Sequence, residues 1–481
     1  MPTNTGAGAS KQYEALLGTH EQYQNLNARW RFLLNSFLGG EVYRQGQYLT
    51  RYANESEMDY ITRMWTTPLD NHAKGVLSVY NAFLFRNPPQ RDFASLEGDA
   101  QLQDFLDDCN FDGQSFDSFM KDVSIYSGVF GHVWVVMVKP NVGATTRADE
   151  LQIGARPYVN MITPLAALDW EWTRMPAGNY ELTYFKYMED SDRSHIFTIK
   201  EWHKDQIITS VIDKEDKMIR SQVIEQNGLG YIPITICYSQ RSHKRGIGVS
   251  EIDDIADIQR AIYNEYSEIE QTIRISGHPS LVKTPDTEAV AGAGSIVQMP
   301  DGLDPGLKPY LLQPSGQNVS AIYESIKERV NAIDRMANLG SARAIQSRTM
   351  SGVAMETEFQ MLNARLSDKA DNLELCEENI WYFYCEYQGV TWDGEVEYPD
   401  SFHLQDKKND ADVLIAARTT VSDPEYQKML DHEIMETVLG QEQLDIYLTD
   451  PMQYQNPAQV PAGTPNEVQQ QEQGIKQQGQ Q

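Results

Sequence analysis

Residues 249–276 form an unbroken helical pattern whose apolar side chains follow one narrow stripe. The stripe consists of Ile252, Ile255, Ile258, Ile262, Tyr266, Ile269 and Ile273, spaced three and four residues apart. This spacing averages about 3.5 residues, which is the repeat of a coiled-coil seam between helices. At about 1.5 Å per residue the helix would span roughly 40 Å. We expect a stripe this narrow to be too slim for the core of a single chain, and therefore to pack the helices of neighbouring subunits.

A second helix with a narrow seam is expected at residues 320–338. Between the two helices, residues 278–319 are rich in Pro and Gly and contain short β-like runs at 281–283, 295–299 and 310–312. Ser250 is placed to cap the start of the first helix, and Gly277 ends it. The sequence therefore predicts two long helices that flank a small projecting unit.

The rest of the chain mixes helical and β patterns, which predicts an α+β fold. Helices are expected at residues 23–38, 55–65, 68–85 and 116–130, and after Pro424. Strands are expected at residues 132–138, 158–162, 180–187, 195–202, 206–212 and 232–238, and over 390–404. Residues 353–388 lack Gly and Pro, which predicts a helix well above average length.

The overall charge limits how this chain could bind nucleic acid. The formal net charge is −29, from 69 acidic and 40 basic residues. Such a balance disfavours a surface that grips phosphates. It fits both a wall along which DNA slides without sticking and a soluble acidic protein without a DNA role, and charge alone does not separate the two. The helix at 249–276 carries seven carboxylates against two arginines. If this helix lined a channel, Glu251, Asp254, Asp257, Glu265 and Glu268 would form an acidic wall.

Motifs for catalysis or for a cofactor are missing from the sequence, so we expect neither an enzyme nor a metal site. There is no GxxxxGK[ST], GxSxG or HExxH pattern, and the four cysteines form no CxxC pair, so buried free thiols are expected. Asp400 and the run Asp406-Lys407-Lys408 loosely fit a magnesium nuclease signature. Their close spacing favours a solvated turn instead. No signal peptide or membrane span is evident, so folding in a cytoplasm is expected.

Several motifs, in this order, resemble a group of portal proteins of tailed bacteriophages. The opening helices carry Phe37-Leu38-Gly39-Gly40-Glu41 and Leu84-Phe85-Arg86-Asn87-Pro88-Pro89. Later matches are Val123-Ser124-Ile125-Tyr126-Ser127-Gly128, Ile232-Pro233-Ile234, Val249-Ser250-Glu251-Ile252-Asp253-Asp254, Ser276-Gly277-His278-Pro279 and Thr349-Met350-Ser351-Gly352-Val353-Ala354. The resemblance covers roughly residues 20–400 and is strengthened by the helix, small unit, helix order.

The resemblance implies a ring of twelve subunits at one capsid vertex, through which double-stranded DNA is packaged and ejected. The implied parts are a wing (1–248 and 353–408), stem helices (249–277 and 320–339), a clip (278–319), a tunnel loop (340–352), a crown (409–452) and a disordered Gln-rich tail (453–481). The tunnel loop contains Arg343 and Arg348 and no acidic residue. These two arginines would contact DNA in the channel, or would pair with acidic residues of the next subunit.

The resemblance also implies a location and a set of partners. The protein would be assembled in the host cytoplasm and would reside in the virion. Its partners would be further copies of itself, the major capsid protein, the terminase large subunit and head–tail adaptor proteins, with a scaffolding protein as a further expected partner. Two other functions stay open. One is a different virion or scaffold protein with a coiled-coil stem, and the other is a metal-dependent nuclease.

Overall fold

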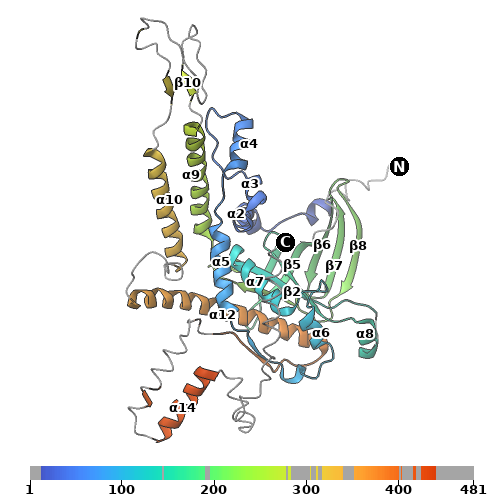
Figure 1. Ribbon diagram of the computed structural model, residues 1–481. Coiled ribbons are helices and arrows are strands. Elements are labelled where there is room, and N and C mark those ends of the chain that lie inside the picture. The colour runs from blue at the N-terminus through green and yellow to red at the C-terminus, as the bar shows by residue number, and fades with distance from the viewer. Residues whose placement is uncertain are drawn as a thin grey trace, which may run out of the picture. The chain divides into compact units, whose positions relative to one another are not determined.

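The computed structural model describes residues 12–143, 146–189, 195–277, 280–282, 304, 310–312, 317–339, 352–399, 402, 415, 417–418 and 424–439. The chain divides into two compact units, Met1–Phe402 and His403–Gln481. Unit 1 contains all of the described strands and the long helices (Figure 1). In unit 2 the structure describes helix α14 (Pro424–Leu439), which begins at the predicted proline.

The N-terminal part of unit 1 is helical. Its helices are α2 (Glu21–Leu38), α3 (Gly40–Gln45), α4 (Glu57–Thr66) and α5 (His72–Leu84). Gly39 ends α2 with a φ of 67°, and a Cβ at this position would lie 2.5 Å from Asn71 Nδ2. Helix α3, directly after this turn, was not predicted. Its six residues are too few to display a helical repeat.

A buried three-stranded antiparallel sheet lies at the centre of unit 1. Strand β2 (His132–Val138) pairs on one side with β3 (Tyr158–Ile162) and on the other with β9 (Ile234–Tyr238). Helix α7 (Phe116–Phe130) leads into β2 through Gly131, whose φ is 89°. Both elements have the predicted bounds, because a capping serine, Ser115, and a glycine delimit them.

A second sheet is a five-stranded antiparallel meander. Its strands, in both spatial and chain order, are β4 (Ala167–Arg174), β5 (Tyr180–Glu189), β6 (Ile196–His203), β7 (Gln206–Asp213) and β8 (Met218–Gln226). The turn predicted at 176–178 joins β4 to β5. Strands β4 and β8 were missed. Strand β8 is exposed along most of its length and therefore lacks the apolar alternation that marks a half-buried strand.

Two long helices run side by side in unit 1 (Figure 1), α9 (Asp253–Gly277) and α10 (Gln317–Met336). Between them in the chain, β10 (Ser280–Val282) pairs antiparallel with β11 (Tyr310–Leu312). The predicted pattern of two helices around a small β unit is therefore present. The predicted run 295–299 lies outside the described residues. We refer to α9 and α10 as the helix pair.

The long helix is α12 (Gly352–Gln388), with 37 residues, and it packs on the central sheet. Its buried stripe includes Leu362, Leu366, Leu373, Cys376 and Ile380, each at most 1% exposed. Within the described part of 390–404, the expected strand is present as β12 (Glu395–Glu397), paired with β1 (Gln90–Asp92). Shorter elements are η1 (Ala94–Leu96), α6 (Leu102–Asp107) and α8 (Arg147–Ile153).

The four cysteines are buried free thiols, as predicted. Among the described helices, none combines the length and the apolarity needed to cross a membrane.

Candidate functional site

The isoleucine seam of α9 is buried against the chain's own helices. Ile252, Ile255, Ile262 and Ile269 are at most 2% exposed and belong to one core cluster with residues of α2, α5 and α10. Ile258 is partly buried against the same cluster. The expectation that the stripe is too narrow for a single chain's core is therefore wrong. Ala256, Gln259, Tyr263 and Ser267 are also buried, and they widen the covered face beyond the isoleucines.

Two polar side chains in this face form hydrogen bonds with backbone groups of neighbouring helices. Gln259 accepts a hydrogen bond from the Ala73 amide (2.8 Å) and donates to the Ser36 carbonyl (3.0 Å). The Tyr263 hydroxyl donates to the Met64 carbonyl at 2.9 Å. Because a buried polar group is costly unless it is paired, these bonds fix which helices α9 packs against.

Glu251 does not lie on an exposed acidic wall, contrary to the sequence-based expectation. Its side chain is 6% exposed and forms an ion pair with Lys369 of α12 (3.0 Å), which is 4% exposed. The Ser239 hydroxyl donates to the same carboxylate. A charge buried this far is retained only with a partner, so Glu251 and Lys369 connect the base of α9 to α12.

Ser250 does not cap α9 as expected, because the helix begins at Asp253. The Ser250 hydroxyl instead donates toward the carbonyls of Gly128 (3.1 Å) and Val129 (2.7 Å) at the end of α7. The Glu251 amide also donates to the Gly128 carbonyl at 3.0 Å. The segment before α9 is therefore tied to α7 rather than arranged as a helix cap.

The other predicted wall residues differ in what surrounds them. Asp257 pairs with Arg29 at 2.9 Å, and Glu265 pairs with Arg329 of α10 at 3.0 Å. Glu268 is exposed but accepts a hydrogen bond from the Tyr52 hydroxyl (2.6 Å), whereas Asp254 is exposed. Together with Lys369, these cations reduce the charge balance of the segment from −5 to −2. The wall is therefore less acidic than a count along the helix indicates.

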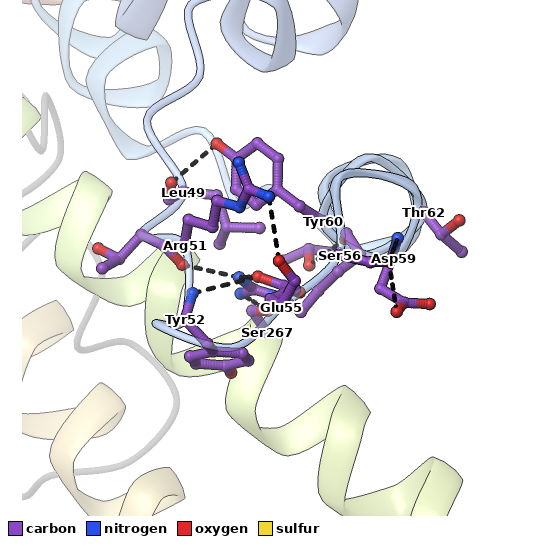
Figure 2. A network of polar contacts seen from close by, with 12 residues as sticks. Leu49, Arg51, Tyr52, Glu55, Ser56, Asp59, Tyr60, Thr62 and Ser267 are labelled. Carbon is purple, nitrogen blue, oxygen red and sulfur yellow. Dashed lines mark hydrogen bonds and ion pairs between the residues drawn. The ribbon is translucent and has the colours of Figure 1, made fainter.

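A polar network joins the segment before α4 to the middle of α9 (Figure 2). Arg63 binds both carboxylate oxygens of Glu55 at 2.7 Å and donates to the Ser267 hydroxyl at 2.9 Å. Its guanidinium lies 4.0 Å from the centre of the Tyr52 ring. The hydrogen bonds from Arg63 lower the pKa of Glu55 below its ordinary value. Sequence reasoning missed this network, because Arg63 and Ser267 are 204 residues apart.

His132, at the start of β2, is a second buried titratable group. It accepts a hydrogen bond from the Gly248 amide at 3.2 Å, just before α9. Burial lowers its pKa to about 3. The neutral ring is therefore part of the native packing at neutral pH.

Some predicted site residues lie outside the described residues, namely Arg343, Arg348, Asp400 and Asp406. The DNA-contact role of Arg343 and Arg348 stays a prediction. Within the described part of the chain, no cluster of three metal-ligating side chains occurs.

A cluster of basic residues in the loop at 240–249 was missed. It contains Arg241, Lys244 and Arg245. The signal in the sequence was the density of basic residues in a chain dominated by acidic ones.

Comparisons with known proteins add little about function. No protein-family model matches the chain. No curated protein matches it either.

Solved structures with some similarity come from a gene transfer agent (GTA) particle. A chain in the neck of an empty GTA particle, computed with C6 symmetry, is 11% identical, with a TM-score of 0.46 over 82% of this chain and 99% of that one. A chain in the neck of the native particle, computed with C12 symmetry, is 12% identical, with a TM-score of 0.42 over 74% and 89%. A chain in the native virion is 11% identical, with a TM-score of 0.43 over 81% and 98%. Similarity at this level carries no conclusion about what this chain does.

Proposed function

We propose that this chain is a portal subunit, which forms a ring at one capsid vertex through which double-stranded DNA is packaged and ejected. In this proposal the ring has twelve copies, resides in the virion and is assembled in the host cytoplasm. It contacts the major capsid protein, the terminase large subunit, head–tail adaptors and a scaffolding protein. The proposal starts from the ordered motifs that resemble phage portals.

The observation that carries the proposal is the helix pair with the β10–β11 ladder inserted between its members. The 25 residues of α9 span roughly 37 Å. Its base is fixed to the α/β body through Glu251 and Lys369, and its middle through Gln259 and Arg63. A rigid rod of this kind suits the wall of an axial channel, and the inserted unit suits a contact with packaging or tail proteins.

In this proposal the exposed carboxylates of α9, Asp254 and Glu268, line the channel, although the exposed Arg260 and Arg274 lie on the same helix. Repeated around a ring, such carboxylates repel phosphates and let DNA slide. Arg343 and Arg348 of the proposed tunnel loop would supply transient phosphate contacts that resist backsliding of packaged DNA.

Imaging the purified full-length chain tests this proposal. Negative-stain microscopy and native mass spectrometry should show rings of about twelve copies with an axial channel. A stable monomer over micromolar concentrations, or a filament without a channel, would refute the portal assignment. A closed oligomer without a channel would favour a different virion or scaffold role.

We propose no catalytic role for the chain. Incubation of the purified protein with linear DNA and magnesium tests this, since a nuclease would cleave the DNA and lose the activity in Asp406→Ala. Cleavage with that dependence would overturn the proposal.

A further inference from the structure

The loop at residues 240–249 is held rigidly at the end of β9. The Val249 amide donates to the Gln240 carbonyl at 2.8 Å, and Ser242 donates through both its amide and its hydroxyl to the Ile247 carbonyl. Gly248 packs so closely on Gly131 that a Cβ at Gly248 would lie 1.9 Å from the Gly131 carbonyl oxygen. The side chains of this loop are therefore presented from a fixed backbone.

Three exposed cations, Arg241, Lys244 and Arg245, project from this loop, which we term the cationic loop. Within the part of the chain that the structure describes, none of the three forms an ion pair. Arg245 lies 3.4 Å from the centre of the Tyr180 ring and Arg241 lies 5.2 Å from that of Tyr238, while Lys244 Nζ donates to Gln22 at 2.8 Å. In a chain with 69 acidic residues and 40 basic ones, a cluster without carboxylate partners leaves its charge available to a partner.

Apolar surface adjoins the cationic loop. A hollow of about 470 Å³ lies between the loop and α12 and is bordered by Trp172, Tyr238 and Leu375. Leu375 is 47% exposed, and Met361 and Tyr382 of α12 are 56% and 43% exposed. These three residues are separated by 14 and 7 positions, so they fall on one side of the helix. Cations and aromatic rings beside exposed apolar side chains are typical of a protein–protein interface.

We propose that the cationic loop and the exposed side of α12 bind the acidic surface of a second copy of this chain. This inference rests on the proposed ring and identifies one of the contacts that would close it. The formal charge of −29 makes each copy a source of carboxylates at the high local concentration of an oligomer. Nucleic acid is a poorer candidate partner, because its phosphates would leave Leu375 and Tyr382 exposed to water. The negative charge of the chain would also oppose the approach of phosphates.

Cross-linking of isotopically mixed assemblies tests which partner occupies the loop. Full-length protein made with ¹⁴N and with ¹⁵N is mixed, assembled and treated with a carbodiimide, which joins lysine amines to carboxylates in direct contact. We expect Lys244 in cross-linked peptide pairs that combine the two isotopes, which requires two copies. Cross-links from Lys244 that are found only within one isotope, or none at all from an assembled ring, would overturn the inference and leave the ring proposal standing.

Charge reversal gives a second test with a matched control. Arg241→Glu, Lys244→Glu and Arg245→Glu together should raise the concentration needed for assembly at least about tenfold at low salt, because like charges would face each other. The control is Arg31→Glu, Lys74→Glu and Arg86→Glu, which changes three exposed cations elsewhere by the same charge. Far-ultraviolet circular dichroism checks that both variants fold.

The outcomes separate the two proposals. If wild type forms no ring, the portal proposal fails and this inference fails with it. If wild type and the loop variant assemble equally, only the inference fails. Binding of double-stranded DNA that the loop variant loses, without a change in assembly, would identify nucleic acid as the occupant and would also overturn the inference.

Discussion

Replacing Arg63 by Met removes the centre of the network between the segment before α4 and α9. Arg63 and Glu55 are 3% and 7% exposed in their side chains, so the substitution leaves a carboxylate without its cation in a nearly dry site. Loss of one partner of a buried pair is costly because the remaining charge keeps its desolvation penalty. Tyr52, which covers the pair, is itself 39% exposed and admits some water. We therefore expect destabilisation of about 2 to 3 kcal/mol at pH 7.

Hydrogen exchange followed by mass spectrometry measures this effect locally. The amides of α4 should exchange faster in Arg63→Met by the factor that corresponds to this free energy, about 30- to 150-fold. Arg51→Met is the matched control, since Arg51 is exposed, hydrogen-bonds the Glu55 backbone carbonyl at 3.0 Å and lies 6.0 Å from the centre of the Tyr60 ring, without a hydrogen bond to the Glu55 carboxylate. Adding Glu55→Gln to Arg63→Met should recover part of the loss, because no unpaired charge then remains.

The effect should depend on pH in a defined direction. Arg63 lowers the pKa of Glu55, so the stability from this pair is present above the unfolded pKa of about 4.3 and is lost as pH falls through the folded value. The difference between wild type and Arg63→Met should therefore shrink below about pH 4. A loss under about 1 kcal/mol at pH 7, or a double variant as unstable as the single one, would refute this account of the network.

Four other expectations can be tested directly. Ile262→Asp should prevent folding of the single chain, visible by circular dichroism, because Ile262 is 1% exposed in its core; a folded but unassembled monomer would contradict this. Replacing residues 284–309 by a Gly/Ser linker should leave rings intact and abolish pull-down of the terminase motor, whereas loss of rings would make this segment a subunit interface. Arg343→Ala with Arg348→Ala should leave rings intact and reduce the packaged DNA per particle; normal genomes would exclude the DNA contact. The pKa of buried His132 is lowered to about 3, so the unfolding free energy should fall as pH drops below about 6.5, and less steeply in His132→Gln.

The sequence by itself determined the elements whose pattern is local. The repeat of Ile252, Ile255, Ile262 and Ile269 placed α9, and the lack of Gly and Pro placed α12. The predicted order of a long helix, a small β unit and a second helix is present in α9, β10, β11 and α10. Helix repeats depend on neighbours a few residues away, so they can be recognised without knowledge of the fold. The cap expected at Ser250 could not be, because Ser250 instead bonds to the end of α7.

Tertiary structure alone decided what covers each face. A count of carboxylates along α9 made Glu251 a wall residue, but Lys369, 118 positions later, buries and neutralises it. The isoleucine seam was expected to pack against another subunit, but α2 and α5 cover it, with Gln259 bonded to both. An apolar stripe indicates that a helix face is shielded from water, but it does not indicate which surface shields it. That surface is supplied by residues far away in the chain, whose proximity only the folded structure establishes.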